Sequence, residues 1–176
     1  YRAFMQSMPF FGIIAISVTF VITLGEIDLS FPSIVGITSL TFGLILTATD
    51  GNFFIAFALA SILGMFAGLV NGLLVTKIGI PSIVATIGTL YFWRGLVNVI
   101  SQGKGPAIVD VADGTWHHAL FVEKLFDKIP AQFIWFIVLT GLMQWVYRYH
   151  KFGNHIHFVG DNKASSQMMG INVDNV

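Results

Sequence analysis

Two carboxylates, Glu26 and Asp28, stand between long stretches at residues 3–25 and 29–49 that contain no Asp, Glu, Lys or Arg. A carboxylate at the centre of a bilayer costs roughly 2.5–3.5 kcal/mol on insertion scales, so it persists where it faces protein, water or a partner charge. Such a group can bind a proton or cation, or line a polar route across the membrane. The same acids also fit a hydrated turn at the membrane surface, and Asp28 could cap the next helix.

Four further polar residues stand within apolar stretches and are candidates for a translocation path. Asn71, Thr86 and Thr89 could offer hydrogen bonds to a neutral solute, or they could bond neighbouring helices, at roughly 0.6 kcal/mol each. Arg94 could contact solute hydroxyl groups or an acid on a neighbouring helix. Its long side chain could equally reach the lipid headgroups beside the adjacent aromatic residues.

Other chemistries find little support in the residues. The histidines form two pairs, His117 with His118 and His155 with His157, but no third ligand is evident near either pair, and a metal site needs three or four. There is no nucleophile with a positioned base and no glycine-rich phosphate loop. The chain contains no cysteine. The sequence therefore predicts no enzyme activity, no metal, no cofactor and no ATP site of its own.

Composition places these residues in a membrane protein. Only 10% of the residues are charged, against about 25% in ordinary globular domains, and 55% are hydrophobic. The formal net charge is zero, which excludes a basic surface that would attract nucleic acid. About 20 residues of helix cross the roughly 30 Å hydrocarbon layer, and residues 51–76 and 129–147 form two more uncharged stretches of that order.

We therefore expect an all-α, polytopic transmembrane helical bundle with about five spans. The expected spans are residues 4–24, 33–48, 53–76, 82–101 and 130–147. Gly25 and Pro32 separate the first two spans, because both residues break helices. Ser30 or Ser33 can cap the start of the second span. Gly64 and Gly68 in the third span stand four residues apart, which favours close contact between helices.

Two polar segments complete the chain. Residues 102–128 form a connection in which apolar side chains suggest a short amphipathic helix on the membrane surface. Those side chains are Trp116, Leu120, Phe121, Leu125 and Phe126. After Arg148 the tail is polar, and we expect a short helix at 163–169, capped by Asp161 or Asn162 and stopped by Gly170.

Charge counting does not orient these spans. Outside the spans, each side of the membrane receives four basic residues, so the positive-inside rule gives no answer. One side has Lys77, Arg148, Lys151 and Lys163, and the other has Arg2, Lys104, Lys124 and Lys128.

Four segments, in this order, resemble the membrane permease subunits of bacterial ABC importers for ribose, xylose, galactose and related small sugars. They are residues 25–30 (GEIDLS) with 33–36 (SIVG), 68–75 (GLVNGLLV), 80–90 (IPSIVATIGTL) with 94–96 (RGL), and 159–164 (VGDNKA) with 170–173 (GINV). The chain departs from the family pattern at Phe31-Pro32, at Asn154 and at Asp161.

The resemblance implies a multi-pass protein of the bacterial inner membrane. Its partners would be cytoplasmic ABC ATPase subunits, a periplasmic solute-binding protein and a second permease subunit, in a homodimer or heterodimer. Residues 1–176 would be part of a single permease domain, a fragment of a longer chain, with 101–128 periplasmic and 148–176 a cytoplasmic coupling loop. The residues implied in ATPase coupling are Gly160, Asp161, Asn162, Lys163, Ala164, Gly170, Ile171 and Asn172.

Two functions follow as hypotheses. The first is a permease subunit that translocates a small sugar or sugar-like solute while a partner hydrolyses ATP. The alternative is an ion-coupled secondary transporter or channel that uses Glu26 or Asp28 to bind a proton or cation. The sequence leaves the solute open among pentoses, hexoses, polyols and similar molecules.

Overall fold

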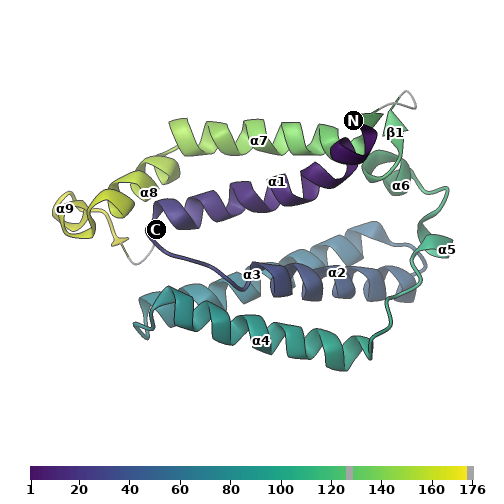
Figure 1. Cartoon of the computed structure of the whole chain (residues 1–176), viewed down its shortest axis with the longest axis horizontal. Coiled ribbons are helices and arrows are strands. Elements are labelled where there is room, and N and C mark those ends of the chain that lie inside the picture. The colour runs from purple at the N-terminus through teal and green to yellow at the C-terminus, as the bar shows by residue number, and fades with distance from the viewer. Residues whose placement is uncertain (126–128, 174–176) are drawn as a thin grey trace. The chain divides into compact units, whose positions relative to one another are not determined.

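The computed structural model describes residues 1–125 and 129–173, and it divides into two compact units. The central unit comprises residues 28–117, and the terminal unit combines residues 1–27 with residues from 118 onward. Figure 1 shows the helices of each unit along the chain. Most of the described residues are helical, and turns, short irregular connections and one short strand pair make up the rest, so the expectation of an all-α helical protein is confirmed.

The central unit contains three long helices. These are α2 (Phe31–Ala48), α3 (Phe53–Thr76) and α4 (Ser82–Ser101), followed by the one-turn helix α5 (Val109–Ala112). A tight turn joins α2 to α3, where Gly51 has a φ of 88° and the side chain of Asn52 caps α3 by accepting from the Ile55 amide. Helices α3 and α4 both pack against α2.

Small residues let these helices approach one another. A methyl group added at Gly64 of α3 would lie 3.3 Å from Thr38 of α2, so part of the expected Gly64–Gly68 face is in contact with a helix. A buried cluster then forms from all three helices. It comprises Ile37 and Leu40 of α2, Ala67 of α3 and Trp93 of α4.

The terminal unit pairs the first long helix of the chain with the last. Helix α1 (Arg2–Thr23) lies beside α7 (Ala131–Tyr149), and the two run in the same direction (Figure 1). Gly12 lies against the ring of Phe136 near one end, and Phe20 contacts Tyr147 edge to face at 5.4 Å near the other. Beyond α7 come α8 (Lys151–Asp161) and α9 (Lys163–Met168).

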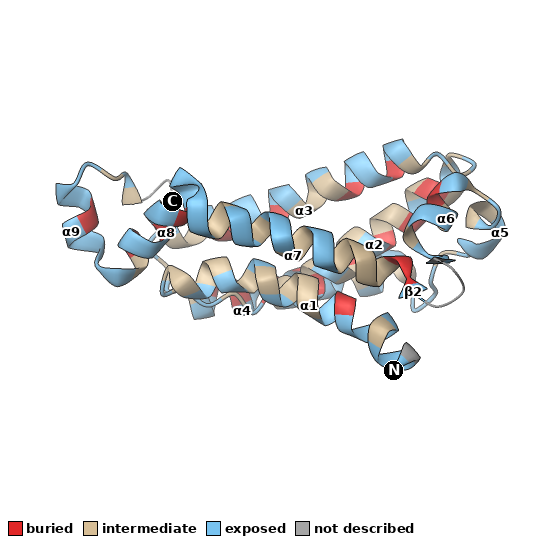
Figure 2. Cartoon of the chain, turned by 90° about the horizontal axis from the view of Figure 1, so that it is seen from above, coloured by how far each residue is buried: buried red, intermediate tan, exposed pale blue. Residues whose placement is uncertain are grey.

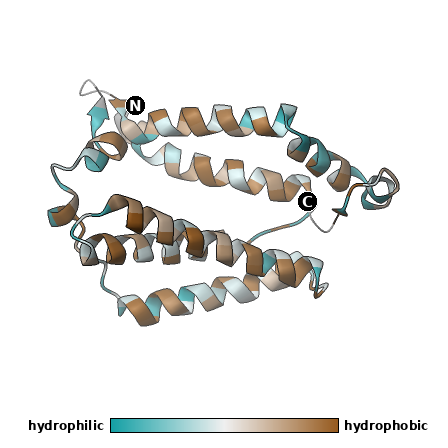
Figure 3. Cartoon of the chain, turned by 180° about the vertical axis from the view of Figure 1, so that it is seen from behind, coloured by the Kyte–Doolittle hydropathy of each residue, from teal (hydrophilic) through white to brown (hydrophobic). Residues whose placement is uncertain are grey.

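Four of the described helices are long and apolar enough to cross a membrane: residues 3–23 of α1, and α2, α3 and α4. Figure 3 colours most residues of these helices as hydrophobic. Pro32 is tolerated in the first turn of α2, so this helix begins at Phe31, two residues before the expected span.

The expected fifth span forms helix α7 but is not among those four. Gln132, Gln144 and Arg148 make α7 less apolar than the others, so its passage through the membrane stays a prediction. The direction of the helix supports that prediction. The first and fifth of five alternating spans must run the same way, and α1 and α7 do.

The expected amphipathic helix in the connection is shorter than predicted. Helix α6 (Trp116–Phe121) ends before Leu125, which lies in strand β1 (Lys124–Leu125), paired antiparallel with β2 (Ile129–Pro130). The helix is shorter because the chain reverses direction after it. The Ala131 amide donates to the Glu123 carbonyl at 2.9 Å, next to the strand pair, so the residues after α6 are extended. Phe126, Asp127 and Lys128 lie outside the described residues.

Candidate functional site: a buried polar network and an exposed helical hairpin

Asp28 orders the backbone at the start of α2. One of its carboxylate oxygens accepts hydrogen bonds from the Ser30 amide at 2.7 Å and from the Ser30 hydroxyl at 2.6 Å. This pattern is an Asx turn, in which an acidic side chain bonds the backbone two residues further on. Ser30 is fully buried at the N-cap position, although its hydroxyl makes no capping bond. Asp28 therefore shapes the chain just before the helix.

Ser30 begins a buried chain of hydrogen bonds across the three helices of the central unit. The Asn71 side-chain amide of α3 donates to the Ser30 hydroxyl at 2.7 Å, and the Thr89 hydroxyl of α4 donates to the Asn71 carbonyl oxygen at 2.7 Å. Asn71 and Thr89 are 7% and 9% exposed. Since unpaired polar groups are costly in an apolar environment, this network fixes how the three helices are rotated.

The two remaining path candidates of α4 differ from one another, and Thr86 touches this chain of bonds, because its carbonyl accepts from the Thr89 hydroxyl at 3.3 Å. Thr86 is buried, and its hydroxyl donates to the Ser82 carbonyl of the preceding turn at 2.7 Å. Arg94 is exposed, and within residues 1–125 and 129–173 its side chain makes no hydrogen bond or ion pair. The structure thus brings Asp28, Asn71 and Thr89 into one network and leaves Arg94 on the surface of the unit.

Glu26 belongs to the terminal unit and has a distant partner in the sequence. Lys163, the first residue of α9, donates to a Glu26 carboxylate oxygen at 2.7 Å. The two side chains are 57% and 30% exposed, so water screens the pair and its strength is modest. Glu26, which lies between the first two helices, thereby contacts the segment that we expect to couple to an ATPase.

Helix α9 is short but closed at both ends. The Asn162 side chain accepts from the Ser165 amide at 3.0 Å, which is an N-cap. At the other end the Ile171 amide donates to the Ser166 carbonyl at 3.1 Å and the Gly170 amide to the Gln167 carbonyl at 3.0 Å. These are the two bonds of a Schellman motif, for which Gly170 adopts a φ of 81°. The expected helix, its Asn162 cap and its glycine stop are confirmed.

Helix α8 is a feature that sequence reasoning missed. His150 caps it, since its ring nitrogen accepts from the Phe152 amide at 3.2 Å. Every third residue, Gly153, Ile156 and Val159, is buried, while most of the intervening residues are exposed. This spacing of three residues, in a mostly polar segment, could have indicated a helix with one buried face. Figure 3 shows how the hydropathy of the chain changes from α7 into α8.

Two glycines seat α8 against the ends of α1 and α7. A methyl group at Gly160 would overlap the backbone carbonyl of Thr23, and one at Gly153 would overlap the carbonyl of Tyr147. The Thr23 and Tyr147 hydroxyl groups are themselves hydrogen-bonded at 2.9 Å. The hairpin of α8 and α9 is thus packed directly on the backbone of the terminal unit.

The surface of this helical hairpin is open to a partner. Asp161, Ala164, Gly170 and Asn172 are exposed, and Ile171 is half-buried. Figure 2 shows the predominantly exposed surface of α9. Met168 is 90% exposed and Met169 is 58% exposed. Flexible methionines on a surface are typical of protein contacts, and the sequence reasoning had not selected these two.

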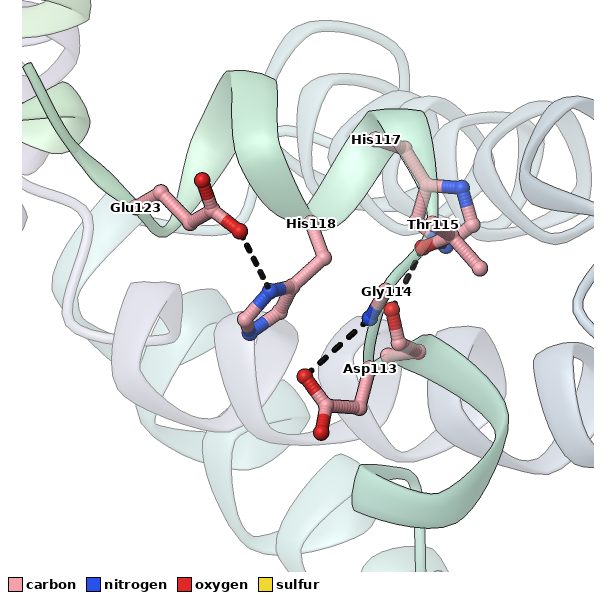
Figure 4. A network of polar contacts seen from close by, with 7 residues as sticks. Asp113, Gly114, Thr115, His117, His118 and Glu123 are labelled. Atoms are coloured by element: carbon pink, nitrogen blue, oxygen red, sulfur yellow. Dashed lines mark hydrogen bonds and ion pairs between the residues drawn. The ribbon is translucent and has the colours of Figure 1, made fainter.

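His117 and His118 each lie beside a local partner. In Figure 4, His117 and His118 point in different directions. His117 pairs with the Thr115 hydroxyl at 3.0 Å, and His118 lies 3.8 Å from a Glu123 oxygen. The part of the chain that the structure describes holds no group of three or more metal-ligating side chains.

Known proteins resemble this chain along nearly its whole length. The family model for the permease component of the branched-chain amino acid transport system matches residues 2–176. The autoinducer 2 import system permease protein LsrC of Yersinia pseudotuberculosis serotype O:3 (strain YPIII) is 33% identical over 169 residues, covering 93% of this chain. Its counterpart in Yersinia pestis (strain Pestoides F) is 32% identical over 168 residues. The chain spans 45% of the length of each relative. No solved structure matches.

Proposed function

Because the chain belongs to the family of branched-chain amino acid transport system permease components, we propose that it forms part of the membrane permease subunit of an ATP-driven bacterial importer. The observation that carries this proposal is the family match over residues 2–176, which includes every helix described above. A permease of this kind spans the inner membrane several times and has no catalytic chemistry of its own. ATP hydrolysis belongs to separate ATPase subunits.

The solute we propose is a small, uncharged, hydroxylated molecule, a sugar or a sugar-like compound. The polar side chains within α3 and α4 are mostly neutral donors and acceptors, among them Asn71, Thr86 and Thr89. A zwitterionic amino acid would call for buried charges of both signs, whereas the one charge within these helices, Arg94, is exposed. The four motifs that resemble simple-sugar permeases support the same solute class.

We further propose that the hairpin of α8 and α9 faces the cytoplasm and contacts an ATPase subunit. Residues 102–128 would then face the periplasm, where a solute-binding protein delivers the solute. A second permease subunit would complete the pathway. The exposed Met168 and the closed ends of α9 support this assignment, because a rigid short helix with an apolar tip can fit a pocket of a partner.

The environments of both carboxylates favour this function over ion-coupled transport. Asp28 accepts two hydrogen bonds from Ser30, and Glu26 pairs with Lys163. A carboxylate that binds a transported proton or cation must release its partners in each cycle. Both acids instead take part in contacts that shape the chain.

Energy coupling is tested by uptake of radiolabelled ribose, xylose and galactose in cells that make the permease with its native partners. In right-side-out membrane vesicles loaded with ATP, we expect vanadate included in the lumen to abolish uptake, and we expect a protonophore to have no effect while ATP is maintained. Excess leucine should not compete. Uptake that collapses with the protonophore at constant ATP, or that leucine inhibits, would overturn the proposal.

A further inference from the structure

The helical hairpin contacts the end of α1 and the non-helical segment that follows it. Helix α1 stops at Thr23, and residues 24–30 run without helix to the start of α2. Gly25 has a φ of 79°, a conformation that favours glycine and turns the chain away from the helix axis. Glu26 therefore follows α1 by three residues and precedes the Asp28 turn by two.

One steric contact fixes α8 at this place. Gly160, in the last turn of α8, lies so close to the Thr23 carbonyl that no side chain would fit. Phe152 at the start of α8 also stacks on Phe20, with ring centroids 6.3 Å apart. Helix α8 thus has contacts with α1 at both of its ends, and it cannot shift without moving the last turn of α1.

Helix α9 follows α8 after a single residue. Asn162, with extended backbone angles of −157° and 106°, is the hinge between α8 and α9. The Lys163 side chain at the start of α9 forms an ion pair with Glu26, three residues beyond the end of α1. This pair, at 2.7 Å, joins α9 to the non-helical segment across 137 positions of sequence.

We propose that the Glu26–Lys163 ion pair transmits the displacement of α9 to residues 24–30, so that both are positioning residues for energy coupling. The inference rests on the proposed function, in which an ATPase moves α9. When α9 is displaced, Lys163 draws Glu26 with it. Asp28 follows two residues later, and its bonds to Ser30 lead into the Ser30–Asn71–Thr89 network of the central unit.

The exposure of the pair suits this role. An ion pair that is 57% and 30% exposed can break and re-form at little cost, because water solvates both groups in the open state. A buried pair would have a large desolvation penalty and would stay in one state. The Glu26–Lys163 contact can therefore exist in one state of the transport cycle and be absent in another.

Charge exchange tests the proposal in the permease assembled with its native ATPase and binding protein. The measured quantity is the ratio of ATP hydrolysis with solute-loaded binding protein to hydrolysis without it. We expect Glu26→Lys and Lys163→Glu each to lower this ratio by about two- to fivefold, the factor that corresponds to an exposed ion pair. The double exchange should restore at least half of the wild-type ratio.

Lys151→Glu provides the matched control. Lys151 is an exposed lysine on α8 whose side chain makes no hydrogen bond or ion pair within the described ranges, so its reversal should leave the ratio unchanged. A purely structural role for the pair would lower the thermal stability of the single variants together with the ratio. We expect their melting temperatures in detergent to match the wild type.

Several outcomes would overturn the inference. They are single variants that keep the wild-type ratio, and a double exchange that fails to restore it. If the charge reversals prevent assembly, Glu26→Gln and Lys163→Gln replace them, and an unchanged ratio in both would also refute the role. A wild-type assembly in which loaded binding protein does not stimulate hydrolysis would contradict the proposed function itself, independently of these variants.

Discussion

The central and terminal units place their polar groups in opposite ways. In the central unit, Ser30, Asn71 and Thr89 are buried and bonded to one another between three helices. In the terminal unit, α1 and α7 pack through rings, a glycine and one hydrogen bond between hydroxyl groups, and the Glu26–Lys163 ion pair lies beyond the end of α1, where water reaches both groups. Figure 2 shows the scarcity of buried residues along α1, of whose membrane-spanning window 6% is buried.

This difference suggests a division of work within the permease. A buried, satisfied network specifies one arrangement of helices and resists change. An exposed ion pair and a helix joined by one extended residue permit motion. The central unit is therefore suited to move as one body, and the terminal unit is suited to receive a displacement at α9 and pass it on.

The largest effect is expected where the terminal unit is most tightly packed. Gly160→Val would push a side chain into the Thr23 carbonyl, and overpacking of this kind costs roughly 1–3 kcal/mol, more where backbone must move. We expect transport to fall at least tenfold while α1 to α4 remain inserted. Solute uptake and protease sensitivity of the α8–α9 segment would measure both effects.

Gly141→Val supplies the comparison for that variant. Gly141 also lies in a helix of the terminal unit, but no atom outside its own helix comes within 4 Å of an added methyl group. Its replacement should leave uptake near the wild-type level. Equal losses in the two valine variants would show that the Gly160–Thr23 contact has no special part in coupling.

A smaller effect is expected from the central network. Asn71→Leu removes two hydrogen bonds, each worth about 0.6 kcal/mol on average in membrane helices, and leaves Ser30 and Thr89 without this partner. We expect a loss of about 1–2 kcal/mol in stability, seen as a lower melting temperature in detergent. Asn98→Leu on the exposed face of α4 should show no such loss. Matching melting temperatures for both variants would contradict the structural role of the network.

The smallest effect is expected at Trp93. Its ring fills the cluster of Ile37, Leu40 and Ala67, but its indole nitrogen is buried without a hydrogen-bond partner among the described residues. Trp93→Phe leaves a small cavity but also removes that unpaired donor, and because the two effects oppose one another we expect stability to fall by about 1 kcal/mol or less. A loss in thermal unfolding larger than that of Asn71→Leu would contradict this ranking.

Much of the fold could be predicted because long uncharged runs and helix breakers mark the spans. Residues 53–76 and 82–101 form helices with the expected bounds, set by Asn52 on one side and Pro81 on the other. Helix α9 was also predictable, since Asn162 and Gly170 are strong end signals. Local chemistry determines these boundaries, so the sequence is sufficient to locate them.

Contacts between distant residues could not be predicted in the same way. Asn71 is a polar residue in an apolar helix, but only the rotation of α3 decides whether it faces Ser30 or a solute path. The pairing of Glu26 with Lys163 depends on how α8 packs on Thr23. The sequence shows both charged residues but does not indicate that they pair. Helix α8 was not predicted because its buried face has only three residues, one of them a glycine, within a mostly polar segment.

Photo-crosslinking from α9 tests the central claim most directly. A photoreactive amino acid at Met168, which is 90% exposed, is compared with one at Val109, 71% exposed in the connection between α4 and α7. In the intact importer, we predict that the probe at Met168 forms a covalent adduct with the ATPase subunit and that the probe at Val109 does not. An ATPase adduct from Val109, with none from Met168, would contradict the account.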